Sequence, residues 1–349
     1  MTVGLSERIK AARLRAGLSM EDLAKLLNLS KQSVYKFEKD QLTPNPEVLH
    51  NIALYLNIPI NELFSKEKRL EQVSFRSGVE EAMIKLSSIE DEVIEEMELT
   101  TELEALTKDT IVFDNPLKHW QIKDLSDVER AAAEVRLQWQ LGFAPISNIV
   151  GVLENKGICV VEKNSQYDYE GFSAFYQGKP IIVLNTKTQE ITRKRFTALH
   201  ELGHILLGSI VVESLKDNIE QICDTFAGAL LLPEQVLKQF WKGRTKFLMQ
   251  DFISLKETFG ISIQAIWRRA VHLKLLSWES LHKWKEAYQA QPNYGNYMGS
   301  ESPRRLELLM LKCLANGKIT YDQGIEKVKG LKNNLDKTLL VNLKYSLSI

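Results

Sequence analysis

The feature that most constrains this chain is a pair of histidines in the stretch TALHELGHILLG, residues 197–208. His200 and His204 are four residues apart, so on a helix both side chains project from one face, about as close as two ligands of one metal ion. Glu201 lies roughly 100° further round such a helix, where it can act as a general base beside the ion. The pattern predicts either a zinc-binding catalytic helix or an ordinary core helix that carries two histidines.

A catalytic zinc ion needs a third protein ligand and an open fourth position. The stretch IEQICDTFAGALLLP supplies two candidates, Glu220 and Asp224, which share one helical face. One carboxylate can bind the ion while the other accepts a hydrogen bond from a histidine ligand and fixes its tautomer. Two solvated acids on an exposed face are the alternative, but Phe226 and Leu230 make the helix amphipathic and weaken that alternative.

Length and composition indicate several globular domains in a reducing compartment. The chain has 349 residues, more than one hydrophobic core usually serves, with 44% hydrophobic and 26% charged residues. Its cysteines, Cys159, Cys223 and Cys313, are too widely spaced for a disulfide framework or a cysteine-bound zinc ion. No apolar run approaches the ~20 residues that cross a bilayer, and the N-terminal stretch is not signal-like. We therefore expect a cytoplasmic protein with no membrane partner.

Short helices are predicted over residues 1–65. Ser19 begins the helix SMEDLAKLLNL and Ser30 begins SKQSVYKFEKD, with only a few residues around Asn28 between them. This spacing is typical of a helix-turn-helix. From SMEDLAKLLNL to PINELF the sequence resembles the Cro and phage-repressor (XRE) class of DNA-binding domains.

The resemblance implies that the second of these helices enters the major groove of double-stranded DNA. Base contacts are expected from three side chains that can read guanine and adenine edges: Lys31, Gln32 and Lys36. Phosphate contacts are expected from three hydroxyls or the helix N-terminal amides beside them: Ser19, Ser30 and Ser33. Because residues 1–65 are only weakly basic, a role in dimerisation or partner contact alone is left open.

Residues 66–125 are predicted to form an acidic helical connecting arm. Between residues 71 and 104, eleven acidic side chains are accompanied only by Arg76 and Lys85. Such a stretch would repel DNA phosphate, so any contact with DNA must come from elsewhere. We interpret the acidic run as a solvated face of one or two arm helices, and packing of these helices on the following domain is left open. Residues 291–349 are predicted to contain a turn-rich linker and a helical C-terminal segment.

Residues 126–290 are predicted to form the catalytic domain. A long amphipathic helix is expected between Ser126 and Gly142, a strand at GICVVEK and a hairpin at FSAFYQGKPIIVLN. Helical stretches follow, and the first of them carries the two histidines. The fold class is therefore α+β and multidomain, with an all-α helix-turn-helix bundle and a central, mainly helical, zincin-like domain that contains a small β-sheet.

Over about residues 126–280 the chain resembles the ImmA/IrrE family of zinc metallopeptidases. The resemblance rests on FTALHELGHILLG, CDTFAGALLLP, the hairpin GFSAFYQGKPIIVLNTK, and SIQAIWRRAVHLKLLS. Many members carry an acidic residue and an alanine where this chain has Ile222 and Cys223. This departure leaves Glu220 as the only suitable carboxylate there, and its spacing to Asp224 is similar to that in thermolysin-like gluzincins.

What the family implies is hydrolysis of a peptide bond in a DNA-bound repressor or an antitoxin-type partner that is encoded nearby. Three residues would hold Zn²⁺: His200, His204 and Glu220. Asp224 would orient a histidine ligand, and Glu201 would take a proton from the zinc-bound water and deliver it to the leaving amine. An extended substrate would pair with the edge of the hairpin, and three tyrosines are candidates for stabilising the oxyanion: Tyr167, Tyr169 and Tyr176.

Three functions fit these residues. The first is a DNA-binding, zinc-dependent metalloendopeptidase that regulates transcription by cleaving a partner protein. The second is a transcriptional regulator whose metal site senses a ligand or is catalytically idle, although such a site would not need a base at Glu201. The third is a protease effector of a toxin–antitoxin or phage-defence system, which needs the same chemistry as the first. A homodimer is compatible with each.

Overall fold

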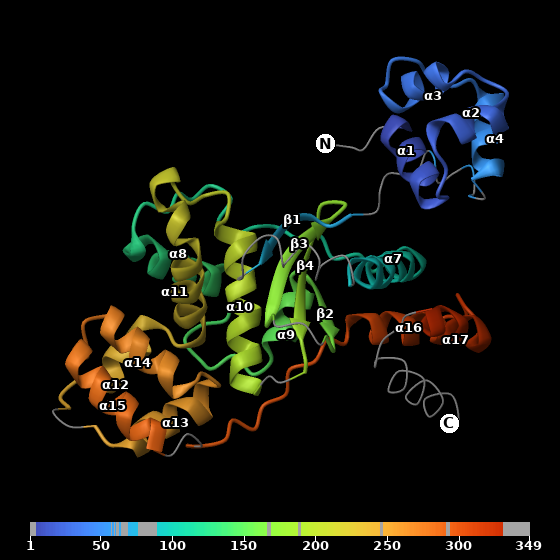
Figure 1. Cartoon of the computed structure of the whole chain (residues 1–349). Coiled ribbons are helices and arrows are strands. Elements are labelled where there is room, and N and C mark those ends of the chain that lie inside the picture. The colour runs from blue at the N-terminus through green and yellow to red at the C-terminus, as the bar shows by residue number, and fades with distance from the viewer. Residues whose placement is uncertain are drawn as a thin grey trace. The chain divides into compact units, whose positions relative to one another are not determined.

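The chain divides into two units, Met1–Arg69 and Leu70–Ile349, which are described separately (Figure 1). The computed structural model describes residues 5–56, 58, 60, 63, 69–75, 89–165, 169–187, 190–244, 247–290 and 294–330. Within these ranges, no helix is both long and apolar enough to span a membrane.

The described part of the first unit is helical, with α1 (Leu5–Arg15), α2 (Met20–Leu27), α3 (Lys31–Glu38) and α4 (Pro46–Tyr55). Ser19 and Asp22 begin α2 with a reciprocal capping box, and Asn28 ends it in the left-handed conformation, at φ 55°. This left-handed residue turns the chain into α3 within a few residues, as a helix-turn-helix requires. A buried ion pair, from Arg13 Nε to Glu38 Oε1 at 2.6 Å, ties α1 to α3.

The second unit is built around a four-stranded sheet with the order β1-β3-β4-β2. Its strands are β1 (Glu71–Phe75), β2 (Cys159–Lys163), β3 (Gly171–Tyr176) and β4 (Lys179–Asn185). The predicted hairpin is confirmed, because β3 and β4 pair antiparallel through a turn with Gly178 at φ 79°. β2 lies parallel to β4, and β1 lies antiparallel to β3 at the outer edge.

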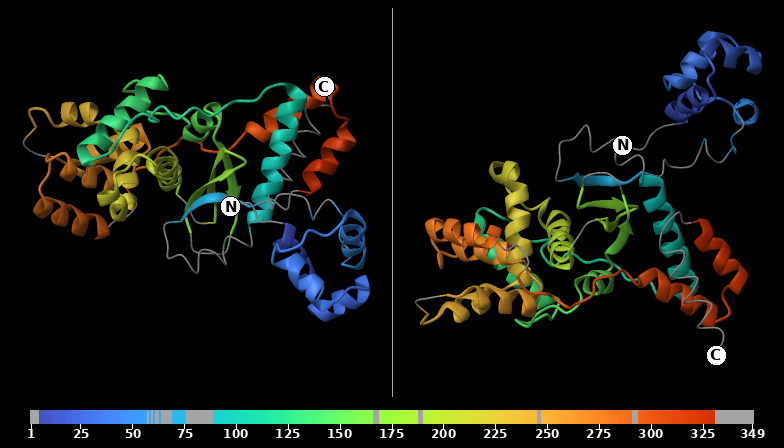
Figure 2. Two further views of the ribbon diagram at one scale, coloured as in Figure 1. Left: turned by 90° about the horizontal axis from the view of Figure 1, so that it is seen from above. Right: turned by 60° about the horizontal axis from the view of Figure 1, so that its bottom comes forward.

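Helices cover both faces of this sheet (Figures 1 and 2). On one face α10 (Ile191–Leu207) and α9 (Ile149–Asn155) pack on the sheet in a core that takes in Val160, Ile182 and Leu184 of the strands. Further from the sheet, α8 (Leu125–Gln138) contributes to the same core. On the other face α7 (Glu90–Thr107) packs its apolar side on the alternate strand residues, among them Phe172. The sheet is therefore a central layer between helices.

The acidic stretch is not a uniformly solvated arm. Within α7, Glu96 and Glu104 are buried, and each pairs with a lysine of the sheet: Lys163 at 3.3 Å and Lys179 at 2.7 Å. The expectation of a solvated helical face is thus wrong for these two acids, because α7 packs along the sheet. The same stretch also supplies β1, a strand that its sequence does not predict. Residues 76–88 lie outside the described ranges.

The remaining helices form a layer beside α10. They are the 3-10 helix η1 (Glu213–Asn218), α11 (Ile219–Leu231), α12 (Glu234–Trp241), α13 (Met249–Phe259), α14 (Ile263–His272) and α15 (Trp278–Ala290). The N-cap of α8 lies two residues earlier than expected: it is Asp124 rather than Ser126, and its carboxylate accepts hydrogen bonds from the amides of Ser126 and Asp127. Ser126 therefore lies inside the helix and is not its cap.

The predicted C-terminal segment contains α16 (Arg305–Ala315) and α17 (Tyr321–Gly330), and α16 packs on α7. The extended stretch before α16 is fixed to the domain rather than being a free linker. Buried Glu301 accepts hydrogen bonds from the amides of Ile149 and Val150 at 3.0 and 2.9 Å, and it also pairs with buried Arg195 of α10. This carboxylate thereby joins the first turn of α9 to the helix that carries the histidines.

Candidate metal centre

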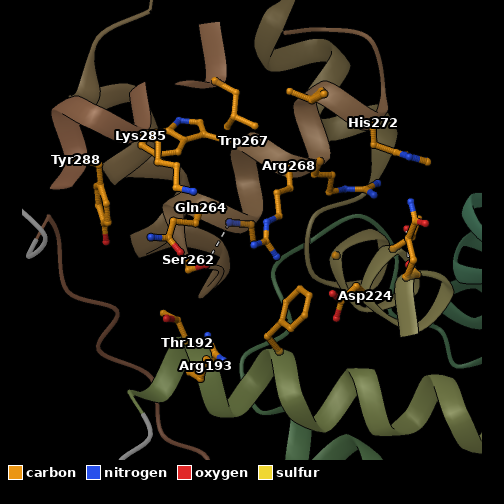
Figure 3. Close-up of a pocket in the computed structure, with 18 of the residues that line it drawn as sticks. Thr192, Arg193, Asp224, Ser262, Gln264, Trp267, Arg268, His272, Lys285 and Tyr288 are labelled. Atoms are coloured by element: carbon orange, nitrogen blue, oxygen red, sulfur yellow. Dashed lines mark hydrogen bonds between the residues drawn. The ribbon is translucent and has the colours of Figure 1, made fainter. Parts of the chain in front are cut away.

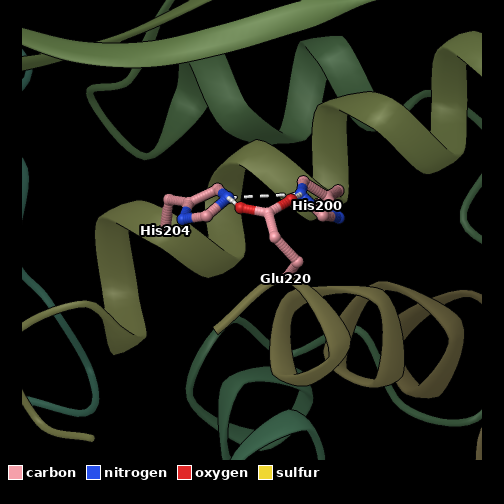
Figure 4. Close-up of side chains that lie close together, drawn as sticks. All are labelled: His200, His204 and Glu220. Carbon is pink, nitrogen blue, oxygen red and sulfur yellow. Dashed lines mark hydrogen bonds and ion pairs between the residues drawn. The ribbon is translucent and has the colours of Figure 1, made fainter. Parts of the chain in front are cut away.

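Two helices, α10 and α11, bring the predicted metal ligands together. Gly203 lies where the helices are closest, since a Cβ there would come within 3.0 Å of Cys223 Sγ. A glycine at this position lets the backbones approach, and the approach brings Glu220, in the first turn of α11, opposite His200 and His204 (Figure 4).

The three side chains converge on one point. The Nε2 atoms of His200 and His204 lie 3.2 Å apart, and Glu220 places one carboxylate oxygen 3.2 Å from each of them. All three ligand atoms lie within 4.8 Å of one another. His200 is buried, whereas His204 and Glu220 are partly accessible, so the cluster opens to solvent on one side.

Asp224 contacts His200 on the side of the ring that faces away from the cluster. Its Oδ1 lies 2.8 Å from Nδ1 of His200, four residues along α11 from Glu220. A hydrogen bond from Nδ1 to this carboxylate leaves the lone pair of Nε2 directed at the cluster. The helical spacing of Glu220 and Asp224 thus gives each acid a different partner atom.

Glu201 is buried beside the cluster, only 1% exposed. Burial raises the pKa of its carboxyl group, although the two histidines and a hydrogen bond from Ser173 act in the opposite direction. Its Oε2 has no hydrogen-bond partner within the described residues. An acid held this way suits proton transfer, because a raised pKa brings it closer to neutral pH. Ser173 was not anticipated; its place in β3, opposite α10, could not be read from local sequence.

Charges are strongly coupled at this site. Burial would lower the pKa of His200, but hydrogen bonds to Asp224 and Glu220 and the nearby Glu201 raise it to about 9. Burial likewise acts to raise the pKa of Glu220, yet its two histidine partners hold that pKa well below the usual glutamate range. In the absence of a cation, His200 therefore carries positive charge near neutral pH, which balances part of the charge of the acids.

The residues present fit a zinc ion. Two imidazole nitrogens and one carboxylate are a donor set that zinc prefers at catalytic sites, and His204 and Glu220 leave the cluster accessible from solvent. His200 already has its outer nitrogen bound to a carboxylate, as zinc-binding histidines usually do. The buried Glu201 lies next to the cluster without being part of it.

The tyrosines proposed for oxyanion stabilisation do not meet this cluster. The Tyr176 hydroxyl donates to Glu98 of α7 at 2.9 Å, and Tyr169 packs with Phe172 in the core on the α7 side. Both therefore belong to the sheet face opposite α10, which excludes these two candidates. Tyr167 lies outside the described residues.

In the helix-turn-helix, the predicted DNA contacts fall on or near α3. The side chains of Lys31, Gln32 and Lys36 are all exposed, and Lys31 lies 3.9 Å from Glu21. Two of the serines are helix caps: the Oγ atoms of Ser19 and Ser30 accept hydrogen bonds from the amides of Asp22 and Ser33. Ser33 Oγ in turn lies 2.9 Å from Ser30 Oγ. The cap roles place helix N-termini at both positions, where phosphate contacts were expected.

Two protein-family models match the chain, one within each of its two structural units. Residues 153–271 match the IrrE N-terminal-like domain of the peptidase M78 family, and residues 9–63 match a helix-turn-helix domain. The chain thus carries a helix-turn-helix domain followed by a domain similar to the IrrE N-terminal-like domain. The IrrE-like match includes both histidines, Glu201, Glu220 and Asp224, and the helix-turn-helix match includes α3. The architecture expected from the sequence is thereby confirmed.

No curated protein matches the chain. Among solved structures, it is similar at 13% identity to Bacillus thuringiensis PlcR in complex with the peptide PapR7 and DNA, with a TM-score of 0.21 and 98% of each chain covered. The apo form of the competence regulator ComR from Streptococcus vestibularis matches at 13% identity and a TM-score of 0.17, over 99% of this chain and 97% of that one. Scores this low carry no argument about fold or function.

Proposed function

We propose that this protein is a DNA-binding, zinc-dependent endopeptidase that regulates transcription by cleaving a repressor or antitoxin-type protein. The observation that carries the proposal is the convergence of His200, His204 and Glu220 on one point with buried Glu201 beside them. Two histidines and an acid could serve a structural site, but such a site would not need a second, buried carboxylate beside them.

The chemistry is divided between ligands and base. His200, His204 and Glu220 would hold the ion, which when bound polarises the substrate carbonyl and makes water a better nucleophile. Glu201 takes the proton of the attacking water and later donates it to the leaving amine. Asp224 keeps His200 in the tautomer that offers Nε2 to the ion, and Ser173 holds Glu201 by a hydrogen bond.

The path of the substrate is set by β3, whose Ser173 bonds Glu201. An extended substrate was expected to pair with the edge of the hairpin. In this structure β1 already pairs with that edge, the outer side of β3, and Ser74 lies opposite Ser173. A peptide that binds β3 by strand addition must therefore displace β1. The segment just after the helix-turn-helix unit would then compete with the substrate for β3.

DNA binding would come from α3. Lys31, Gln32 and Lys36 are exposed along it, and the capped N-termini at Ser19 and Ser30 direct backbone amides outward for phosphate. A peptidase fixed to DNA would act first on proteins bound nearby, which favours a repressor as the substrate. An antitoxin or phage-defence target needs the same chemistry.

The peptidase proposal is tested by metal content and cleavage together. Zinc is measured in the purified full chain and in Glu220→Ala, and the products of neighbouring genes are then incubated with wild type and with Glu201→Gln. We expect about one zinc per wild-type chain, a large loss of zinc in Glu220→Ala, and cleavage by wild type only, since removing the base costs about 10²–10⁴-fold or more.

Glu213→Gln provides the matched control, because Glu213 is exposed in η1 and outside the site. It should retain both zinc and cleavage. Wild-type protein without zinc would overturn the metallopeptidase proposal. Zinc without cleavage of any neighbouring product would favour the regulator whose metal site senses a ligand.

The DNA proposal is tested by Lys31→Ala with Lys36→Ala. We expect this double variant to lose specific operator binding in a mobility-shift assay while zinc content stays unchanged, since α3 supplies base contacts. Lys10→Ala with Lys25→Ala removes the same charge from α1 and α2 and should weaken binding far less. Retained specific binding by the α3 variant would contradict the assignment of the reading helix.

A further inference from the structure

A pocket of about 860 Å³ lies next to the metal centre but is separate from it. The first half of α10, α11, α14 and α15 form its walls, and none of the three metal ligands lines it (Figure 3). Asp224, whose carboxylate is hydrogen-bonded to Nδ1 of His200, forms part of one wall. Its volume is in the range of sites for small molecules, ~300–1,000 Å³.

Two buried polar groups in the pocket walls have no hydrogen-bond partner within the described residues. They are Thr192 Oγ1 and Trp267 Nε1, and each residue is only 1% exposed. Buried polar groups are rarely left unpaired, because desolvation without a new hydrogen bond is costly. An indole nitrogen can only donate, so Trp267 requires an acceptor that none of the described residues supplies.

The charged groups of the pocket leave positive charge uncompensated. Its acids already have partners: Glu190 pairs with Lys256 at 3.0 Å, and Asp224 with His200. Arg268 and Lys285 reach into the same space and have neither an ion pair nor a hydrogen bond to any residue that the structure describes (Figure 3). Their cations and the unpaired indole together favour a ligand rich in acceptors and negatively charged.

Aromatic side chains supply the rest of the wall. Phe196 and Tyr288 are half-buried, and Trp278 is 65% exposed although it lines the pocket. Exposed aromatic faces beside cations suit a ligand with a planar ring, which can stack on them. The amides of Gln221 and Gln264, also in the lining, can meet both donors and acceptors on the edge of such a ring.

We propose that this pocket binds a nucleotide, with its phosphate at Arg268 and Lys285 and its base among the aromatic side chains. Thr192 and Trp267 then donate to the acceptor atoms of the ligand. Because Asp224 forms one wall, the bound nucleotide lies on the outer side of the carboxylate that orients His200. The proposal concerns binding and does not depend on peptidase activity.

The test is calorimetric titration of the full chain with AMP and GMP, with adenosine and inorganic phosphate as partial ligands. We expect at least one nucleotide to bind more tightly than either part. Arg268→Ala with Lys285→Ala should weaken that binding by about tenfold or more, since each charge-assisted hydrogen bond contributes substantially. Thr192→Val should also weaken it while keeping or raising the melting temperature, because it removes a buried, unpaired hydroxyl.

Lys274→Ala with Lys283→Ala is the matched control, since both residues lie near or within α14 and α15 but outside the lining. It should bind like wild type. No heat with AMP or GMP at millimolar concentration, equal binding of phosphate and nucleotide, or wild-type affinity in the Arg268 and Lys285 variant would each overturn the proposal. So would tighter binding of single-stranded DNA than of either nucleotide. Zinc content and cleavage are measured separately, so a failure here is distinguishable from a failure of the peptidase proposal.

Discussion

At the scale of single residues, the candidate metal centre contains three carboxylates with different surroundings. Glu220 meets the inner nitrogens of both histidines, Asp224 meets the outer nitrogen of His200, and Glu201 meets neither ring. The helical spacing of four between Glu220 and Asp224 produces the first two roles, because both acids face α10 one turn apart. Each role can be removed separately.

Replacing Asp224 by alanine should reduce zinc affinity by about 10–100-fold, because His200 loses the carboxylate that fixes its tautomer. Competition with a coloured chelator measures this effect without any cleavage assay. Asp217→Ala is the control, since Asp217 is exposed in the neighbouring η1 helix. An unchanged affinity in Asp224→Ala would show that the hydrogen bond at 2.8 Å does not support metal binding.

Zinc uptake should release a proton from His200. In the metal-free protein its pKa is raised to about 9, whereas zinc binds only the neutral imidazole. Lower pH therefore favours the protonated, metal-free form, and the apparent affinity should increase by up to about tenfold per pH unit until pH 9. Calorimetry in two buffers of different ionisation enthalpy should show about one proton released per ion near neutral pH. An affinity that does not vary with pH would contradict this expectation.

At the scale of elements, β1 matters most for the site, because it occupies the edge of β3 where a substrate was expected to pair. It pairs with β3 through Ser74 opposite Ser173 and Phe75 opposite Phe172, with an irregularity after Glu71. Gln72 has a φ of 51°, which is uncommon for a residue other than glycine. A short strand with an irregular register is easier to displace than a central one.

Replacing residues 71–75 by a Gly/Ser segment of equal length should increase cleavage of peptide substrates. The reason is that strand pairing worth even ~1.4 kcal/mol would raise the apparent KM about tenfold. Steady-state kinetics on a peptide from the cleaved partner measures the change, and Glu201→Gln in the same background should remain inactive. A KM that does not fall, in a protein with unchanged zinc content and melting temperature, would show that substrate does not use the outer edge of β3.

At the scale of the whole molecule, two units with separate cores carry separate tasks. Residues 9–63 match the helix-turn-helix family and lie within Met1–Arg69, whereas the IrrE-like match lies entirely within Leu70–Ile349. The first unit has its own apolar core and the buried pair of Arg13 and Glu38. Its stability should therefore be independent of the metal centre.

Separating the chain at the boundary between the two units should leave both functions intact. Residues 70–349 are expected to bind zinc as the full chain does. Residues 1–69 are expected to melt cooperatively and, as a monomer, to bind DNA more weakly than a dimer of the full chain would. Zinc analysis, thermal melting and a mobility-shift assay measure the three properties. Loss of zinc from residues 70–349, despite a cooperative melt, would show that the first unit contributes to the site.

The sequence alone determined the elements whose signals are local. Four-residue spacing predicted that His200 and His204 share a face, that Glu220 and Asp224 share another, and that Ser19 caps α2. The turn at Gly178 predicted the hairpin. These features follow from helical periodicity, capping chemistry and turn preferences within a few residues, so a short stretch of sequence is enough to specify them.

Only the tertiary structure decided which distant segments meet. The pairing of β1 with β3, the burial of Glu96 and Glu104 against lysines of the sheet, and the contact of Ser173 with Glu201 join parts of the chain that no local pattern relates. Tyr169 and Tyr176, two of the three oxyanion candidates, lie on the wrong side of the sheet for the same reason, since alternate strand residues face opposite layers and the sequence does not say which layer holds the site. The sequence thus specified the two helices that carry the candidate metal ligands, and the packing of the sheet between α7 and α10 decided what lies beside them.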